Sequence, residues 1–135
     1  MKTLLIFEKD PDVADLLKEE LEKCDFTVIV STKPDDALRK IEKQMPAVVL
    51  MDMLFHFNFK FDYEGMIRQI KAVSPKTQIV ITTAIDEELH IQKAFNAGAV
   101  RHVPKCCLDE LKRVLEETVE GKSADPTWGW EISDR

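Results

Sequence analysis

The sequence of 135 residues lacks several features that would place it in other classes of protein. It has no basic excess, because 19 lysines and arginines stand against 25 aspartates and glutamates, for a net charge of -6. Direct binding of nucleic acid is therefore not expected, since it usually needs a basic face. No apolar run approaches the roughly 20 residues needed to cross a bilayer, and the start MKTLLIFEKD lacks a signal peptide. We expect a cytoplasmic protein without membrane contact.

Cysteine and glycine are also scarce. The three cysteines, Cys24, Cys106 and Cys107, make no even disulfide framework and no CxxC metal-ligand spacing, as in proteins of a reducing compartment. None of the four glycines follows the first apolar run, where EKDPD stands in place of a glycine-rich phosphate loop. We therefore do not expect an enzyme, and a small enzyme on an α/β scaffold stays only as an alternative.

The chain does have a regular alternation of short apolar runs and amphipathic segments. Strands are expected at residues 4–7, 26–30, 47–51, 79–81 and 100–103, and helices are expected to begin near residues 11, 33, 64, 86 and 108. Parallel neighbouring strands need crossover helices, so the pattern predicts an α/β fold with a parallel sheet. For five such units we predict the flavodoxin-like, doubly wound order 2-1-3-4-5 with five flanking helices.

Two helix starts and one domain boundary are also predicted. Asp10 precedes Pro11, a pair typical of an N-cap and first helical residue, which we favour over a metal-ligand role for Asp10. Thr32 with Asp35 resembles a capping box. Residues 1–120 form the domain. Residues 121–135, with glycine, serine and proline but no helical period, form a C-terminal tail without a separate domain.

Charged and polar residues follow the predicted strands at one edge of the sheet. In this topology ligands bind beyond the carboxyl ends of the first and third strands, where the winding reverses. The residues expected there are Glu8, Lys9, Asp10, Asp52, Thr83 and Lys105. An aspartate at a strand end is often only a turn or a helix cap. The convergence of a carboxylate, a hydroxyl and an ammonium from separate strands favours a functional site around Asp52.

Four segments in order, LLIFEKDPDVADLLKEEL, PAVVLMD, IVITTA and AFNAGAVRHVPK, resemble the receiver domain of bacterial two-component response regulators. The resemblance covers roughly residues 1 to 120. It implies that Asp52 accepts a phosphoryl group from a histidine kinase or phosphotransfer protein, as a carboxylate nucleophile. It implies that Thr83 and Lys105 contact the phosphoryl group, and that Thr83 and His102 act as switch residues. The output would be altered contact with an unknown downstream protein.

The resemblance also implies a metal pocket formed by Glu8, Lys9, Asp10 and the backbone of Leu54. Lys9 departs from the family pattern, because receivers usually carry there an acidic residue that binds Mg²⁺. An ammonium group cannot replace a hard oxygen ligand, so weak Mg²⁺ affinity is expected. An alternative function follows from the same departure: a degenerate receiver that binds proteins independently of phosphorylation.

Phenylalanine is concentrated in one segment, FHFNFKFDY at residues 55–63. Strict alternation of aromatic and polar residues predicts an extended conformation with one aromatic face. Two alternatives remain: the aromatics pack on their own domain, or they meet a partner or a second copy in a homodimer. For Trp128 and Trp130 in the tail, folding back and anchoring to another surface both remain open.

Overall fold

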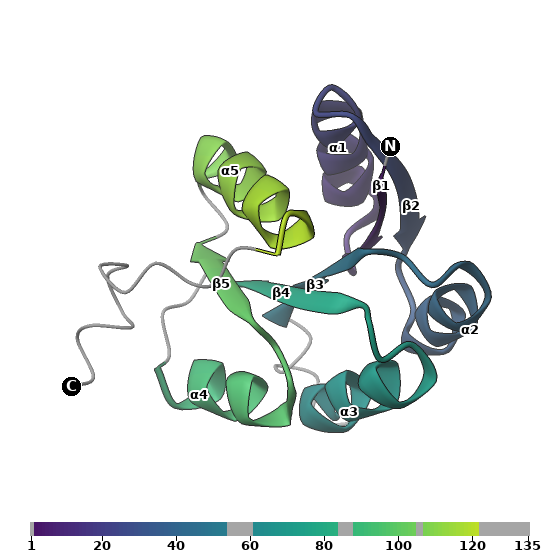
Figure 1. The fold of residues 1–135 in the computed structure, drawn as a ribbon, viewed down its shortest axis with the longest axis vertical. Coiled ribbons are helices and arrows are strands. Elements are labelled where there is room, and N and C mark those ends of the chain that lie inside the picture. Colours follow the sequence, from purple (N-terminus) through teal and green to yellow (C-terminus); the bar gives the residue numbers. More distant parts are fainter. Residues whose placement is uncertain (1, 54–60, 84–87, 105–106, 122–135) are drawn as a thin grey trace.

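The computed structural model describes residues 2–53, 61–83, 88–104 and 107–121, and every structural statement below concerns these residues. Strands and helices alternate through them, as predicted, with bounds that differ from the expected ones by one or two residues (Figure 1). The elements are β1 (Lys2–Phe7), α1 (Pro11–Glu22), β2 (Phe26–Ser31), α2 (Pro34–Gln44), β3 (Val48–Asp52), α3 (Tyr63–Val73), β4 (Gln78–Thr83), α4 (Glu88–Ala97), β5 (Arg101–Pro104) and α5 (Leu108–Val119).

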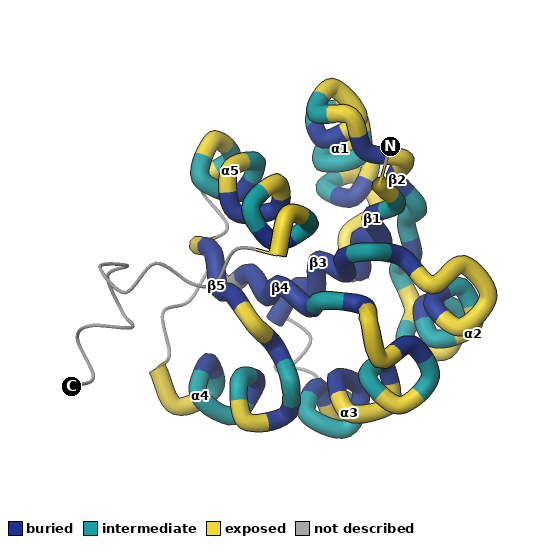
Figure 2. Tube along the Cα trace, viewed as in Figure 1, coloured by how far each residue is buried: buried dark blue, intermediate teal, exposed yellow. Residues whose placement is uncertain are grey.

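The five strands form one parallel sheet in the order β2-β1-β3-β4-β5, which confirms the predicted topology. Helices α1 and α5 cover one face of the sheet, and α2, α3 and α4 cover the other (Figure 1). Each face has its own apolar core, and the central strands are buried on both sides (Figure 2). This explains why β3 consists of a continuous apolar run before Asp52.

The start of α1 agrees with the prediction from the sequence, whereas the start of α2 does not. The Asp10 carboxylate accepts hydrogen bonds from the backbone N–H groups of Asp12 and Val13, so its predicted N-cap role is confirmed. The capping box at Thr32 is wrong: the N-cap of α2 is Lys33, without a side-chain cap bond. The next residue is a proline without an N–H group, and the register of the helix is shifted by one residue.

The described part of the aromatic segment packs on its own domain. Phe61 is half-buried, and its ring meets that of Phe7 edge-on at a centroid distance of 5.9 Å. Tyr63 is buried and is the first residue of α3, so the predicted extended segment does not include it. Asp62 causes this change by capping α3, accepting a hydrogen bond from the N–H of Gly65 at 2.9 Å. The prediction for residues 55–60 lies outside the described residues.

None of the described helices is long and apolar enough to span a membrane.

Candidate functional site

Asp52 is the last residue of β3, the central strand of the sheet. Its side chain is almost fully buried, with a relative exposure of 1%. Side chains alternate along a strand, and Val48 and Leu50 belong to the core beneath α1 and α5. Asp52 therefore continues this row, as a carboxylate placed at the end of an apolar strand.

Glu8 follows β1 directly and reaches the same edge of the sheet as Asp52. Phe7 pairs with Met51 between β1 and β3, so the next residue of each strand comes to the same edge of the sheet. Glu8 is 2% exposed, and its Oε2 accepts a hydrogen bond from the backbone N–H of Asp10 at 3.0 Å. The predicted meeting of the first and third strand ends thus brings two buried carboxylates together.

Lys9 and Asp10 lie at the rim of this site and are exposed to solvent. The Asp10 carboxylate is already engaged in capping α1, as predicted. Lys9 is the cation nearest in sequence to the buried Glu8. The described part of the site therefore has two buried acidic residues, with one acidic and one basic residue at its rim.

Glu8 and Asp52 are the buried carboxylates that the described part of the site offers as hard oxygen ligands. Within the described ranges, no group of three or more histidine, cysteine, aspartate or glutamate residues is placed to hold a metal. Mg²⁺ prefers a near-octahedral set of oxygen ligands, and Glu8 already accepts one backbone hydrogen bond. Leu54, whose backbone was predicted to contribute, lies outside the described residues.

The structure describes only some of the other residues that were predicted for the site. Thr83 ends β4 and pairs with Pro104 of β5, while its side chain and Lys105 lie outside the described residues. His102 is buried on β5. Its strand neighbours face α5, since Arg101 pairs with Glu117 and Val103 belongs to that core. By strand alternation, His102 faces the α4 side of the sheet, opposite to Asp52.

Thr82 is a residue of this site that was not predicted from the sequence. Thr82 is the partner of Asp52 in the pairing of β3 with β4, and it is 3% exposed. Its hydroxyl oxygen is buried and has no hydrogen-bond partner among the described residues. The alternation of β4 could have revealed it, because Val80 and Thr82 lie on the same face of that strand and Val80 packs in the core beneath α1 and α5.

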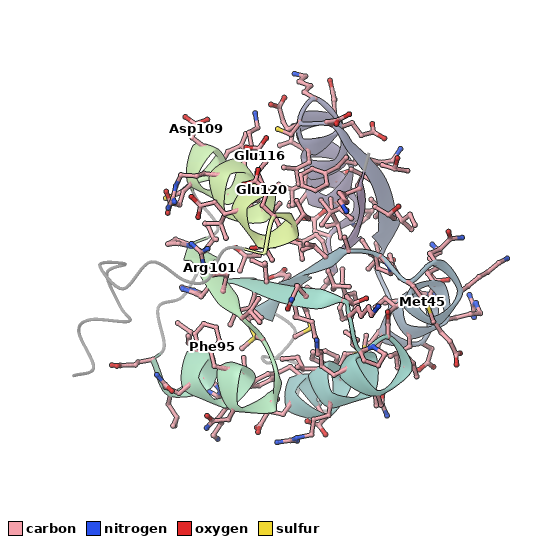
Figure 3. All side chains as sticks on the ribbon, in the orientation of Figure 1. Met45, Phe95, Arg101, Asp109, Glu116 and Glu120 are labelled. Carbon is pink, nitrogen blue, oxygen red and sulfur yellow. The ribbon has the colours of Figure 1, made fainter. Side chains whose placement is uncertain are left out.

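A buried arginine was also missed. Arg101 is 1% exposed and lies between β5 and α5, where its Nη1 is 3.3 Å from Oε1 of Glu117 (Figure 3). Glu117 also receives a hydrogen bond from Arg113, one turn earlier on α5. This pair anchors α5 to the edge strand and is not part of the Asp52 site.

A pocket of about 640 Å³ lies at the other end of the strands, where β3 and β4 begin. Loops that precede β3 and β4 and the end of α5 line it, with Met45 (labelled in Figure 3), Pro46, Pro75 and Val119 among its apolar residues. Pockets often mark binding sites, but this one is separated from Asp52 by the length of β3. It takes no part in the chemistry of the acidic site.

Comparison with known proteins identifies the family. The response regulator receiver domain model matches residues 4–116. The chain is 25% identical over 104 residues to the alkaline phosphatase synthesis transcriptional regulatory protein PhoP of Bacillus subtilis, covering 77% of this chain and 42% of PhoP. It is 31% identical over 132 residues to the response regulator protein GraR of Staphylococcus saprophyticus, covering 83% of this chain and 57% of GraR. The chain thus spans about half the length of these relatives.

Solved structures agree in fold. A response regulator from Thermotoga maritima superposes with a TM-score of 0.78 at 22% identity, covering 89% of this chain and 98% of that one. A CheY-like receiver domain protein from Methanospirillum hungatei JF-1 gives a TM-score of 0.78 at 20% identity, covering 90% and 95%. Because the family match extends over most of the chain and includes both strand ends of the acidic site, this protein belongs to the response regulator receiver domain family.

Proposed function

We propose that the chain accepts a phosphoryl group on Asp52 from a histidine kinase or phosphotransfer protein and relays a signal by changing its protein contacts. The observation that carries this proposal is the burial of the Asp52 carboxylate at the end of the central strand, beside Glu8. A carboxylate buried at the end of a strand, where this topology binds its ligands, is a candidate functional group. The family assignment supplies the class of donor.

The transfer is a displacement at phosphorus. A carboxylate oxygen of Asp52 attacks the phosphorus atom of the phosphohistidine, and the P–N bond breaks. The electron pair of that bond stays on the imidazole nitrogen, while a new P–O bond makes an acyl phosphate on Asp52. The chain acts as acceptor and is not an enzyme with substrates of its own.

Charge explains how this step could act as a switch. A phosphoryl group adds about 1.5 to 2 negative charges at neutral pH. The buried Glu8 already carries a carboxylate next to this position, so the added charge requires a cation or a rearrangement. We assign the cationic role to Lys105 and the switching roles to Thr83 and His102. Lys9, at the rim, supplies a further positive charge.

Magnesium binding is proposed to be weak. The two buried carboxylates offer hard oxygen ligands, whereas Lys9 places an ammonium group at the rim of the same site. Glu8, Asp52 and the backbone of Leu54 would be the residues that hold the ion. Bound there, it would neutralise charge on the phosphoryl oxygens.

The partners follow from the same proposal. The donor is a histidine kinase or phosphotransfer protein, and the target is a protein whose contact with this domain changes on phosphorylation. PhoP is described as a transcriptional regulatory protein, but a net charge of -6 makes direct nucleic-acid binding by this domain unfavourable. A cytoplasmic location is supported by the lack of an even cysteine framework in the sequence.

The test is a small phosphodonor. Incubation with acetyl phosphate, with and without Mg²⁺, should add one phosphoryl mass to the intact protein. Asp52→Asn should abolish the addition, whereas Asp12→Asn, a change at an exposed helix position, should leave it intact. Circular dichroism of each variant checks that it is folded. The proposal fails if the folded wild-type chain gains no mass, or if the Asp52 variant gains as much.

A further inference from the structure

The position of Thr82 points to a second hydroxyl in the Asp52 site. Thr82 and Asp52 are directly paired across β3 and β4. Strands of a parallel sheet lie roughly 4.8 Å apart, and paired residues place their side chains on the same face. On this face the preceding pair, Leu50 and Val80, is apolar core. The sheet therefore changes from apolar to polar at the pair that contains Asp52.

Nothing in the described core accounts for a hydroxyl at this position. Thr82 is 3% exposed, and its Oγ1 has no hydrogen-bond partner among residues 2–53, 61–83, 88–104 and 107–121. A buried polar group without a partner destabilises the folded state, and such groups are rare. Valine has the same shape without this disadvantage. By contrast, the buried hydroxyl of Thr77 is bonded to the carbonyl oxygen of Pro46 at 2.7 Å and to Ser74 Oγ at 2.6 Å.

The chemistry of the neighbouring side chain supplies a partner. A phosphorylated aspartate carries additional strong acceptor oxygens, and a threonine hydroxyl is a donor that can rotate to reach one of them. We propose that Thr82 Oγ1 donates a hydrogen bond to the phosphorylated side chain of Asp52 and thereby prolongs the lifetime of the acyl phosphate. This inference rests on the proposed function. It assigns Thr82 a role separate from that of Thr83, the next residue along β4.

Two substitutions separate this role from a structural one. Thr82→Val removes only the hydroxyl, and Thr82→Ser keeps it. After labelling with acetyl phosphate and removal of the donor, intact mass spectrometry follows the decay of the phosphorylated form. A hydrogen bond to a charged group is worth about a factor of ten or more, so we expect Thr82→Val to lose the phosphoryl group roughly tenfold faster. Thr82→Ser should decay within about twofold of the wild type.

Stability provides the second readout. Without phosphodonor, Thr82→Val should melt at the same temperature as the wild type or higher, because it loses a hydroxyl that lacks a partner. Thr77→Val is the matched control, since that hydroxyl is bonded and lies at the opposite edge of the sheet. It should lower the melting temperature and leave the phosphoryl lifetime unchanged.

The two measurements can each contradict the role proposed for the Thr82 hydroxyl. Equal lifetimes in Thr82→Val and the wild type would refute the role of Thr82 while leaving Asp52 as acceptor. A lower melting temperature in unphosphorylated Thr82→Val would show that the hydroxyl has a structural duty, which also contradicts the inference. If the wild type gains no phosphoryl group at all, the proposed function falls, and this inference falls with it.

Discussion

The hydroxyl oxygen of Tyr63 lies 2.7 Å from Nδ1 of His90, so that the first residue of α3 is hydrogen-bonded to α4. The two rings also meet edge-on, with centroids 5.8 Å apart. Residues 53–62 connect Asp52 to Tyr63 along the chain. This contact therefore connects the end of the segment that follows Asp52 to α4, on the face of the sheet opposite to α1 and α5.

The Tyr63–His90 hydrogen bond should contribute measurably to stability. Tyr63→Phe keeps the ring in the core and removes only the hydroxyl, so we expect a loss of about 1 kcal/mol in the free energy of unfolding. Urea denaturation of Tyr63→Phe, His90→Phe and the double variant measures the coupling between the two side chains. Additive losses, with no coupling energy, would show that the hydrogen bond contributes nothing.

The Arg101–Glu117 pair should matter more, because Arg101 is buried. Glu117→Gln removes the charge opposite the buried guanidinium, and we expect a loss of about 2 kcal/mol after allowing for the partial exposure of Glu117. Glu116→Gln, an exposed change on the same helix, is the control and should stay within about 0.5 kcal/mol of the wild type. Guanidinium would screen the pair, so urea is the appropriate denaturant. Equal stabilities for the two variants would contradict this account.

Acid should weaken the contact between α1 and α5. Hydrogen bonds from Lys23 and Lys112 hold the pKa of the Glu20 carboxyl group below its ordinary value of 4.5. A carboxyl group whose pKa is lower in the folded state stabilises the fold above its unfolded pKa, and this contribution disappears as the pH falls through the folded value. Stability should therefore decline below about pH 4.5.

Thermal unfolding between pH 3 and pH 6 tests the contribution of Glu20. In Glu20→Gln the decline should be shallower than in the wild type, because the carboxyl group whose pKa is lowered in the folded state has been removed. Glu42→Gln, at an exposed position on α2, serves as the control and should follow the wild-type curve. Identical pH profiles for wild type and Glu20→Gln would remove Glu20 from the explanation.

Lys9 should limit Mg²⁺ affinity. Lys9→Asp replaces an ammonium group by an oxygen ligand at the rim of the site, so we expect Mg²⁺ to bind at least tenfold more tightly than in the wild type. Lys76→Asp changes the charge equally at the opposite edge of the sheet and should have little effect. Isothermal titration with MgCl₂ measures all three proteins. Equal affinities for wild type and Lys9→Asp would show that another group completes the site.

The features that could be predicted from the sequence are those that depend on the periodicity of apolar residues. Apolar runs and helical spacing were sufficient for the strand order, and the winding rule placed Asp52 beside the end of β1. The Asp10–Pro11 pair was sufficient for the start of α1. These features depend on local preferences that agree with the fold, which is why they can be read without tertiary information.

What could not be predicted depends on contacts between distant residues. Arg101 resembles a surface cation in the sequence, and only the position of Glu117 on α5 explains its burial. The place of Thr82 in the site depends on the register of β3 and β4, which sets residue 82 opposite Asp52. Tyr63 continued an alternating pattern, but the cap at Asp62 overrode that pattern and started a helix.

The most direct test of the account is to locate the phosphoryl group. Borohydride reduces an aspartyl acyl phosphate to homoserine, and peptide mass spectrometry after labelling with acetyl phosphate identifies the residue that has changed. The account predicts homoserine at position 52, only in labelled protein and not in Asp52→Asn. Modification at another aspartate, or none at position 52 in folded and labelled protein, would contradict it.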